Sequence, residues 1–422
     1  MSGGNGSQRK EGASETCIRR LSREIYTRRE RKQLRRRRLK VDRKSYLYLL
    51  RHFKFGELRN FRFTKRRVPC GEGFYKGKDA ELIRKPDAVP VPPYFEMETT
   101  TICNKRCVIC ENIYWKKEDQ VRRHLTFDEF KHIVDQFPKI RWVNLTGEGS
   151  AFLNPDYPKM LRYLWEKHRT SIWLVDHLCD IGFDRLRREI LPYVHGIYVS
   201  MDAATKETYE AIKVGCSFDN VIQCLKDLIA YKRKYRTPFP HLSFRYIITK
   251  DNVEEIPAFV DLINSIARPW EWGGSSTKIE FTGLLVFDQI RHYYVEHIPS
   301  WVVEELKKRK GGIEFQFVHA EEESNPPIER CKAWLEPYIM LPGWVLPCCA
   351  VLMNNNRPLL RKYAFGNLLE ETMEEVWRND YYMQFKAMVN DPSKPVPRLC
   401  AGCRAYRTKH RIEKYGIWDG HR

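Results

Sequence analysis

Three cysteines stand within eight residues of this chain, at Cys103, Cys107 and Cys110. Structural zinc sites favour paired Cys-x2–4-Cys units, and this uneven Cys-x3-Cys-x2-Cys triplet has no such partner pair nearby. Three thiolates at this spacing can hold one side of a cube of iron and sulfide and leave one iron open to a small molecule. The chain must therefore fold so that one loop presents three thiols around a single centre. A zinc knuckle, or three buried thiols, is the alternative.

A short strand is predicted to lead into this loop. Residues 93–101 read Pro-Tyr-Phe-Glu-Met-Glu-Thr-Thr-Thr, and the alternation of apolar and polar side chains predicts an extended segment. The triplet after such a strand, with Glu98 and Asn104 beside it, resembles the radical S-adenosylmethionine (SAM) superfamily. In that family the cysteine loop follows the first strand of a partial barrel. Ile109 departs from the pattern, since the family more often has an aromatic residue there.

Strand-like and helix-like stretches alternate from residue 94 to about residue 287, which indicates repeated strand–helix units. Strands are predicted at 94–99, 141–146, 171–175, 196–202, 242–248 and 279–286. Helices are predicted at 126–137, 157–168, 184–191, 206–213 and 218–234. The six units resemble the radical SAM core. The expected fold is therefore α/β: a partial (β/α)6 TIM-like barrel with a small cysteine-rich C-terminal domain and a basic N-terminal extension.

The second predicted strand ends in the sequence Gly147-Glu148-Gly149. Glycine lets the backbone approach a ligand closely, and a glutamate offers a carboxylate to an ammonium group. The element resembles the family's Gly-Gly-Glu-Pro motif, which holds the amino group of SAM, although Thr146 replaces the first glycine and Gly149 replaces the proline. A plain strand-to-loop turn with a surface glutamate is the alternative.

Polar residues also mark the ends of two later strands. Ser200 and Asp202 share one strand face by their spacing of two residues, at the carboxyl end where barrel ligands bind. The resemblance implies contact with the SAM ribose there, and Arg245 on the next strand is expected to reach the SAM carboxylate. Each of these side chains, taken alone, is equally typical of a structural polar residue.

The C-terminal part of the chain contains a second set of four cysteines: Cys331, Cys348, Cys400 and Cys403. The first two bracket Gly343 as Cys-x11-Gly-x4-Cys, and Pro342-Gly343 is a turn signal that predicts a hairpin between them. The set resembles the SPASM/twitch extension of radical SAM enzymes. Lys409 occupies the position of the next cysteine of a full SPASM domain, so the resemblance implies a single auxiliary 4Fe–4S cluster. Cys349 could replace the second cysteine, and structural zinc in the same set is the competing interpretation.

The positive charge is concentrated at the amino end. Residues 1–70 contain 23 Lys and Arg against 6 Asp and Glu, a net of +17 out of +20 for the chain, which leaves +3 for the other 352 residues. Residues 1–44 are expected to be a disordered tail or a solvated helix. Residues 45–92 mix basic and aromatic side chains. They are typical of a helix packed on the barrel, or of a surface for anionic lipid or nucleic acid.

The predicted domains are a basic tail (1–44), a basic and aromatic extension (45–92), the barrel (93–290), a connector (291–330) and the auxiliary cluster domain (331–415). Thirteen cysteines without a signal peptide indicate a reducing cytoplasm, where clustered cysteines bind metal. The most apolar stretch, residues 333–353, contains Glu336 and three prolines, which argues against a membrane helix.

The resemblance implies an enzyme whose 4Fe–4S cluster is chelated by the amino nitrogen and carboxylate of SAM. An electron donor such as flavodoxin or ferredoxin would drive cleavage of SAM to a 5′-deoxyadenosyl radical, which abstracts hydrogen from the substrate. The cofactor supplies the difficult chemistry, and the protein positions the substrate and excludes water. The auxiliary cluster would accept an electron or anchor the substrate.

The substrate is less constrained by the sequence. A peptide or protein is favoured, for maturation, crosslinking or epimerisation. The alternative is dehydrogenation or epimerisation of a sugar or aminocyclitol, a glycan-type substrate. A nucleic-acid- or membrane-binding protein with structural clusters is a hypothesis of another class. Cys179, Cys216 and Cys224 lie in the barrel span, and one could donate a hydrogen atom, although lone barrel cysteines are usually small core residues.

Overall fold

A computed structural model describes the barrel, the C-terminal domain and one N-terminal helix. The described residues are 25–52, 86–89, 91–115, 121–267, 277–285, 287–318, 331, 333–403 and 408–421. Two predictions therefore fall largely outside them, the tail before residue 25 and the part of the 45–92 extension between residues 53 and 85. No helix in the described ranges is both long enough and apolar enough to cross a membrane.

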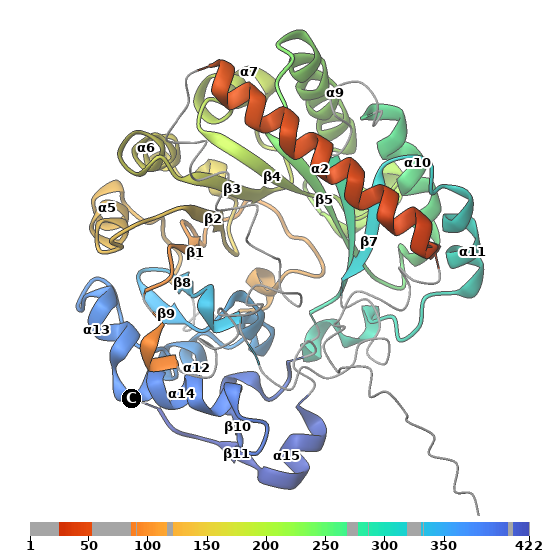
Figure 1. Cartoon of the computed structure of the whole chain (residues 1–422). Coiled ribbons are helices and arrows are strands. Elements are labelled where there is room, and N and C mark those ends of the chain that lie inside the picture. Colours follow the sequence, from red (N-terminus) through yellow and green to blue (C-terminus); the bar gives the residue numbers. More distant parts are fainter. Residues whose placement is uncertain are drawn as a thin grey trace, which may run out of the picture.

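Seven parallel strands form the barrel wall (Figure 1). They are β1 (Tyr94–Glu98), β2 (Trp142–Thr146), β3 (Ser171–Asp176), β4 (Val194–Ser200), β5 (His241–Ile248), β6 (Thr277–Gly283) and β7 (Glu314–Val318). They lie side by side in chain order, so each strand neighbours the next one along the sequence. The six predicted strands are confirmed. The seventh, β7, lies in the predicted connector and extends the barrel sheet beyond residue 290.

Helices cover the outer face of this sheet (Figure 1). They are α5 (Phe127–Asp135), α6 (Tyr157–Tyr163), α7 (Phe183–Arg185), α8 (Lys206–Ile212), α9 (Phe218–Lys234), α10 (Ile256–Ile266) and α11 (Ser300–Lys308). A capping box begins α5, because Thr126 accepts a hydrogen bond from the Glu129 backbone and Glu129 accepts one in return. Apolar helix residues such as Phe130, Leu225 and Phe259 are fully buried against the strands. The core therefore lies between helices and sheet, and the inner wall is left for polar groups.

The C-terminal domain continues the same sheet. The strands β8 (Tyr338–Met340) and β9 (Trp344–Leu346) form the predicted hairpin, and β8 pairs in parallel with β1. The rest of the domain contains α12 (Arg357–Lys362), α13 (Met373–Arg378), α14 (Asp380–Asn390), α15 (Lys409–Tyr415) and a pair of two-residue strands, β10 (Val396–Pro397) and β11 (Ile417–Trp418). The domain is thus joined to the barrel by backbone hydrogen bonds, and β11 lies just beyond the predicted limit at residue 415.

One long basic helix crosses the barrel. This helix, α2 (Arg28–Arg51), begins with a capping box formed by Thr27 and Glu30. Before it, Tyr26 is buried with its ring 5.3 Å from that of Phe315 in β7, and Glu30 pairs with Lys310 at 2.9 Å. Figure 1 shows α2 running across the strands from β7 toward α7. The boundary predicted between residues 44 and 45 therefore falls inside a helix.

Candidate functional site

The three cysteines of the triplet lie on the loop that follows β1. Backbone hydrogen bonds fasten this loop to the end of α8 and the residues that follow it: Arg106 donates to the Val214 carbonyl at 3.0 Å and Val108 to the Ile212 carbonyl at 2.9 Å. The loop also turns back on itself, since the Cys110 amide donates to the Cys107 carbonyl at 3.0 Å. The triplet is therefore held at the carboxyl end of the barrel, as the motif predicts.

The electrostatics of the three thiols suit a positively charged partner. Burial raises the pKa of Cys103, Cys107 and Cys110, and that of Cys110 lies well above its usual range. A charge on Cys107 would raise the pKa of the other two further, which places the thiols near one another. None of the three is in a disulfide. Since thiolates in this setting need a cation to offset burial, the donor set fits the open-cornered 4Fe–4S cluster.

A pair of carboxylates lies directly against the triplet. The Cys110 sulfur, one carboxylate oxygen of Glu111 and one of Glu148 all lie within 4.8 Å of one another. Burial raises the pKa of Glu148 well above its usual range, and Glu111 and Glu98 add like-charge repulsion. An ammonium group would relieve this repulsion and form charge-assisted hydrogen bonds. The structure brings predicted Glu148 to the triplet and adds Glu111, whose only sequence signal is that it follows the last cysteine.

The glycines beside Glu148 are required by close packing. A Cβ atom at Gly149 would lie 2.6 Å from the Thr100 carbonyl oxygen and 2.7 Å from that of Ile102. A Cβ atom at Gly147 would lie 2.8 Å from Cγ of Glu98, and its φ of +153° is one that other residues rarely adopt. The Gly-Glu-Gly sequence therefore sets the β2 turn directly against the start of the cysteine loop.

Ser200 and Asp202 meet at a buried lysine. The Lys213 ammonium lies 2.7 Å from Asp202 Oδ2 and donates to the Ser200 hydroxyl at 2.9 Å. Burial opposes the charge on Lys213, but Asp202 and Cys107 together raise its pKa above the usual range. Asp202 also accepts a hydrogen bond from the Ile247 amide at 2.8 Å. The two predicted residues thus belong to a charged network beside the triplet, and Lys213 was missed because only the fold brings it there.

Arg245 lies on the inner barrel wall. Its guanidinium is 3.9 Å from the centre of the Tyr198 ring, and its Nε is 3.6 Å from Glu280. Lys278 and Gln316 also bind Glu280, the latter at 3.0 Å, so that carboxylate is well supplied with donors. The described partners of Arg245 are thus on β4 and β6, and its role toward the SAM carboxylate stays a prediction.

The C-terminal domain reaches into this site through Arg357. Its guanidinium binds both carboxylate oxygens of Glu98, at 3.1 and 2.5 Å, and both side chains are almost fully buried. Glu98 also accepts a hydrogen bond from the Leu341 amide at 3.0 Å, and the guanidinium lies 4.7 Å from the Trp115 ring centre. This ion pair joins α12 to the end of β1 and was not found from the sequence.

The second cysteine set is gathered within the C-terminal domain. Burial raises the pKa of Cys400 well above its usual range, with Cys403 and Cys331 as further causes, so these three thiols are neighbours. A charge on Cys348 would raise the pKa of the buried Tyr382 in the same domain. Cys349 is exposed, and a charge on it would raise the pKa of Arg245 in the barrel. Four cysteines outside any disulfide fit one auxiliary cluster. The different surroundings favour Cys348 over Cys349 as the fourth ligand.

The three weak candidates for a hydrogen donor fare differently. Cys179 and Cys216 are joined in a disulfide, a state in which neither carries an S–H bond. Cys224 is 4% exposed on α9, which covers the outside of the sheet, and it packs in the hydrophobic core. Cys224 is therefore a core residue, and its position gives no support to a role as a hydrogen-atom donor.

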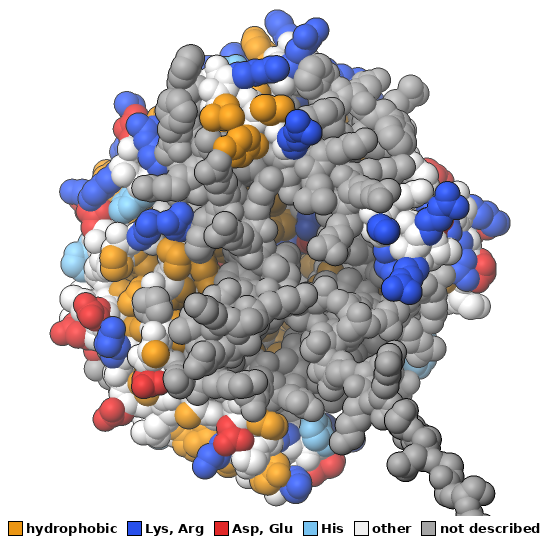
Figure 2. All heavy atoms as spheres, viewed as in Figure 1, with side chains coloured by type: hydrophobic (Ala, Val, Ile, Leu, Met, Phe, Trp, Pro, Cys, Tyr) orange, Lys and Arg blue, Asp and Glu red, His pale blue; other side chains and the backbone are white. Residues whose placement is uncertain are grey.

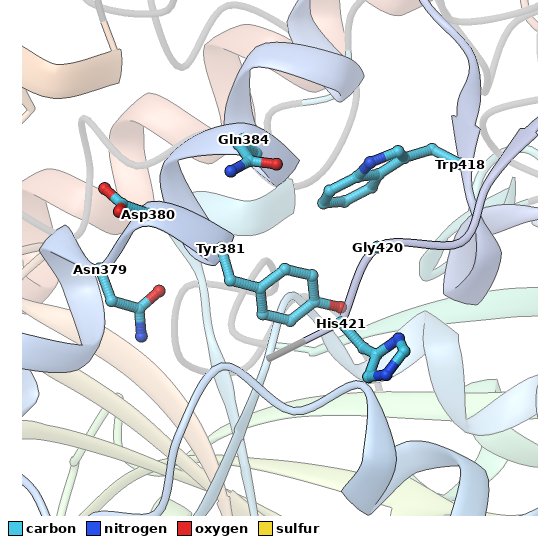
Figure 3. A pocket seen from close by; sticks show the side chains of 7 residues that line it. All are labelled: Asn379, Asp380, Tyr381, Gln384, Trp418, Gly420 and His421. Atoms are coloured by element: carbon cyan, nitrogen blue, oxygen red, sulfur yellow. The ribbon is translucent and has the colours of Figure 1, made fainter.

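A separate cavity of about 300 Å³ lies in the C-terminal domain (Figure 3). It is lined by Asn379, Asp380, Tyr381, Gln384, Trp418, Gly420 and His421. None of the predicted cluster or SAM residues takes part in it. The cavity therefore belongs to the packing of the C-terminal segment against α14 and is not the site described above.

Two family models match the chain. The model described as the radical SAM superfamily matches residues 97–263, and the SPASM model, described as an iron–sulfur cluster-binding domain, matches residues 331–404. These ranges contain the two cysteine sets. The fold and both sites thus define an enzyme of the radical SAM class. The chain belongs to the SPASM group of that class, whose barrel binds SAM and a 4Fe–4S cluster and whose C-terminal domain binds auxiliary iron–sulfur clusters.

Two relatives are similar to this chain at low sequence identity. The chain is 22% identical over 328 residues to the tungsten-containing aldehyde ferredoxin oxidoreductase cofactor-modifying protein of Pyrococcus furiosus, which covers 74% of this chain and 86% of that protein. It is 25% identical over 193 residues to the mycofactocin maturase MftC of Mycobacterium tuberculosis, which covers 45% of this chain and 44% of that protein.

Solved structures support the same fold. SuiB of Streptococcus suis, bound to the precursor peptide SuiA, matches with a TM-score of 0.52 and 16% identity over 83% of this chain and 74% of SuiB. The enzyme anSMEcpe with bound AdoMet matches with a TM-score of 0.52 and 13% identity over 78% of this chain and 92% of its own. At these identities the likeness is one of architecture.

Proposed function

We propose that this radical SAM enzyme abstracts hydrogen from a peptide or protein, in a maturation, crosslinking or epimerisation reaction. The cluster and SAM, when bound, supply a 5′-deoxyadenosyl radical able to attack an unactivated C–H bond. The protein supplies the surroundings. Cys103, Cys107 and Cys110 would hold the cluster, and Glu111 and Glu148 would bind the ammonium of SAM.

The charged network beside the triplet would orient the rest of SAM. Lys213 is held by Asp202 and Ser200 with its charge intact, and it offers a cation next to the cysteine loop. Arg245, whose guanidinium is partly exposed on the inner wall beside Tyr198 and Glu280, stays the proposed partner of the SAM carboxylate, and Lys213 adds a buried positive charge next to the cysteine loop.

The observation that carries the peptide assignment is the chemistry of the inner wall. Aromatic, basic and acidic side chains lie on the same side of neighbouring strands there. They are Trp173, Tyr198, Arg245, Lys278 and Glu280. Such a wall suits a substrate with amide groups and mixed side chains. Two neighbours in fold, SuiB with precursor peptide SuiA and anSMEcpe with the Cp18Cys peptide, contain peptides.

The test uses the reconstituted enzyme under anaerobic conditions. Cell extract from the host grown in deuterated medium, with its peptides and proteins retained, is added with SAM and dithionite, and the mass of 5′-deoxyadenosine is measured. Deuterium in that product reports hydrogen abstraction from a substrate in the extract. Protease treatment of the extract should abolish the label, whereas periodate, which cleaves vicinal diols, should not.

The opposite pattern would favour the sugar or aminocyclitol alternative. Loss of label with periodate and its survival after protease treatment would replace the peptide proposal. The labelled product also identifies the fraction to be purified, so the same assay leads to the substrate itself.

A further inference from the structure

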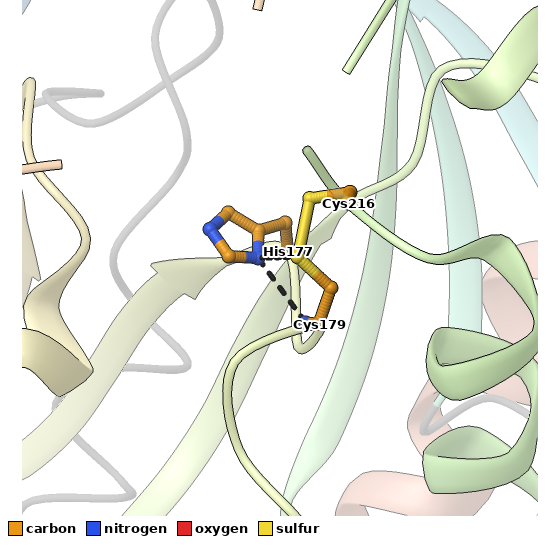
Figure 4. A group of neighbouring side chains, drawn as sticks. All are labelled: His177, Cys179 and Cys216. Carbon is orange, nitrogen blue, oxygen red and sulfur yellow. Dashed lines mark hydrogen bonds between the residues drawn. A yellow bond between two sulfur atoms is a disulfide. The ribbon is translucent and has the colours of Figure 1, made fainter. Parts of the chain in front are cut away.

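A disulfide joins two loops that flank the cysteine triplet. Cys179 follows β3 and Cys216 follows α8, and their Cα atoms are 5.6 Å apart, a separation typical of disulfides (Figure 4). Cys216 is buried, and Cys179 is partly exposed. Reagents in solution would therefore reach the pair through Cys179.

A histidine is placed to serve this pair as a base. Nδ1 of His177 accepts a hydrogen bond from the Cys179 amide at 3.1 Å and lies 2.9 Å from the Cys179 sulfur. On the other side of the ring, Nε2 faces the carboxylate of Asp180 at 3.6 Å. Burial lowers the pKa of His177, which favours the neutral ring, and Nδ1 is the ring nitrogen that faces Cys179. This geometry is that of a thiol with an adjacent proton acceptor.

Both loops also hold the triplet loop. On the Cys216 side, the carbonyls of Ile212 and Val214 accept the backbone hydrogen bonds of the triplet loop. On the Cys179 side, Asp180 pairs with Lys105 at 2.6 Å and accepts from the Asn104 amide group at 3.3 Å. The disulfide therefore closes a ring of contacts around the loop that carries Cys103 and Cys107.

The same chain requires its cluster-binding cysteines to be thiolates, because a cluster cannot be held by disulfides. A disulfide that forms where those thiols stay reduced is one that opens and closes, since cytosolic disulfides are usually transient or redox-sensing. We propose that Cys179 and Cys216 are a reversible dithiol–disulfide pair, with His177 as the proton acceptor, and that the disulfide form clamps the triplet loop around its cluster. This rests on the cluster assignment and not on the substrate.

Closing of the pair balances with a low-molecular-weight disulfide as the oxidant. The Cys179 proton passes to His177, and the thiolate attacks the oxidant, which releases one thiol and leaves a mixed disulfide. The Cys216 thiol loses its proton and attacks the Cys179 sulfur, which expels the second thiol. Two S–H bonds become one S–S bond, and the oxidant gains both electrons and both protons. A dithiol reductant reverses the sequence.

The first measurement concerns the pair itself. The holoprotein is equilibrated anaerobically with mixtures of reduced and oxidised glutathione, free thiols are alkylated, and the peptides with Cys179 and Cys216 are quantified by mass spectrometry. Both should titrate together between dithiol and disulfide. His177→Gln should slow this exchange several-fold without moving its end point, because a base changes the rate and not the equilibrium.

The second measurement concerns the cluster. A chelator is added, and loss of the cluster is monitored by EPR spectroscopy of the reduced protein. Only the part of the EPR signal that changes on adding SAM is used, because that part belongs to the triplet cluster and not to the auxiliary one. The disulfide form should lose this signal several-fold more slowly than the dithiol form. Cys179→Ser and Cys216→Ser should release iron at the dithiol rate in every glutathione mixture. Cys224→Ala, a cysteine outside the pair, should keep the wild-type dependence.

Three outcomes would overturn the proposal. In the first, Cys179 and Cys216 form no disulfide in any glutathione mixture. In the second, the disulfide and dithiol forms release iron at the same rate. In the third, the protein binds one zinc ion at His177, Cys179 and Cys216. A chain that lacked the triplet cluster altogether would already fail in the initial iron analysis. Failure of the cluster assignment is therefore distinguishable from failure of the clamp.

Discussion

At the scale of single residues, the site is shaped by close approach and by unbalanced charge. Gly149 brings the β2 turn against the backbone of the cysteine loop, so the position of Glu148 depends on a missing side chain beside it. The carboxylates of Glu148 and Glu111 then lie close together, with Arg357 as a cation whose charge acts on both, and binding of an ammonium ligand would stabilise the pair further.

Gly149→Ala tests the close approach. The new methyl group would meet two carbonyl oxygens at under 3.0 Å, and backbone atoms cannot move away as a flexible side chain can. We expect a loss of about 1–3 kcal/mol of stability and a drop in bound iron by one cluster. Iron analysis and thermal unfolding measure both. Gly182→Ala, at a glycine with open space around it, is the control and should change neither.

Glu148→Gln and Glu111→Gln test the ammonium site. Removing one charged acceptor should weaken SAM binding by about 1.5–3 kcal/mol, a factor of about 10 to 150 in the dissociation constant. Both clusters should still assemble, since neither residue is a predicted ligand. Equilibrium dialysis with SAM gives the affinity, and iron content gives the control. Wild-type affinity in both variants would show that SAM binds elsewhere.

At the scale of elements, strands and amphipathic helices were predictable because each has its own periodicity. The six strands from β1 to β6 and the hairpin of β8 and β9 lie where the sequence indicates. The strand β7 (Glu314–Val318) was missed although its residues alternate in burial, because the predicted barrel was ended after six strand–helix units and the following residues were assigned to a connector. The helix α2 was divided at residue 44 because its dense positive charge concealed the capping box at Thr27.

Contacts between distant elements were the part that the sequence did not reveal. Lys213, Glu111 and Arg357 have no motif that marks them, and only the fold brings them to the triplet. The ion pair of Glu98 and Arg357 is the clearest case, since 258 residues separate the partners. Periodicity indicates which face of an element is buried, and not which element lies opposite.

Arg357→Met tests this link between α12 and β1. It would leave the Glu98 carboxylate buried without its partner, which costs about 3–5 kcal/mol. The double variant Glu98→Gln, Arg357→Met removes both charges and should recover part of that loss. Urea unfolding of the three proteins gives the comparison. A single variant as stable as the wild type would mean that solvent reaches Glu98.

At the scale of the whole molecule, the barrel is enclosed from several sides. The C-terminal domain lies against β1, α2 contacts Phe239 just before β5, and Tyr26, just before α2, packs on Phe315 of β7. Figure 2 shows Lys and Arg side chains gathered at the right-hand margin, where Figure 1 places α11, whose last turn carries Lys307 and Lys308. Positive charge therefore lies on the helical exterior as well as at the amino end.

Two truncations test the structural role and the binding role of the amino end separately. Removing residues 1–24 should leave SAM cleavage and thermal stability intact. Removing residues 1–44 should lower the melting temperature, because it takes away Tyr26, Glu30 and most of α2. If the tail recruits a polyanion, the shorter deletion should already weaken binding to anionic liposomes or nucleic acid, most strongly at low salt. Co-sedimentation and mobility-shift assays across a salt series measure this, and unchanged binding would assign no such role to residues 1–24.

The pairing of β8 with β1 has a consequence for how the chain can be divided. Without the hairpin, β1 would present a row of unpaired amide and carbonyl groups at the border of a large parallel sheet, a template for addition of foreign strands. In the intact chain β9 takes the border position, and it is shielded in turn: Val345 donates to the Gly366 carbonyl at 3.0 Å and accepts from the Phe365 amide at 2.9 Å. The barrel expressed alone should therefore self-associate into aggregates, which light scattering would detect. The auxiliary domain thus also covers the exposed edge of the barrel sheet.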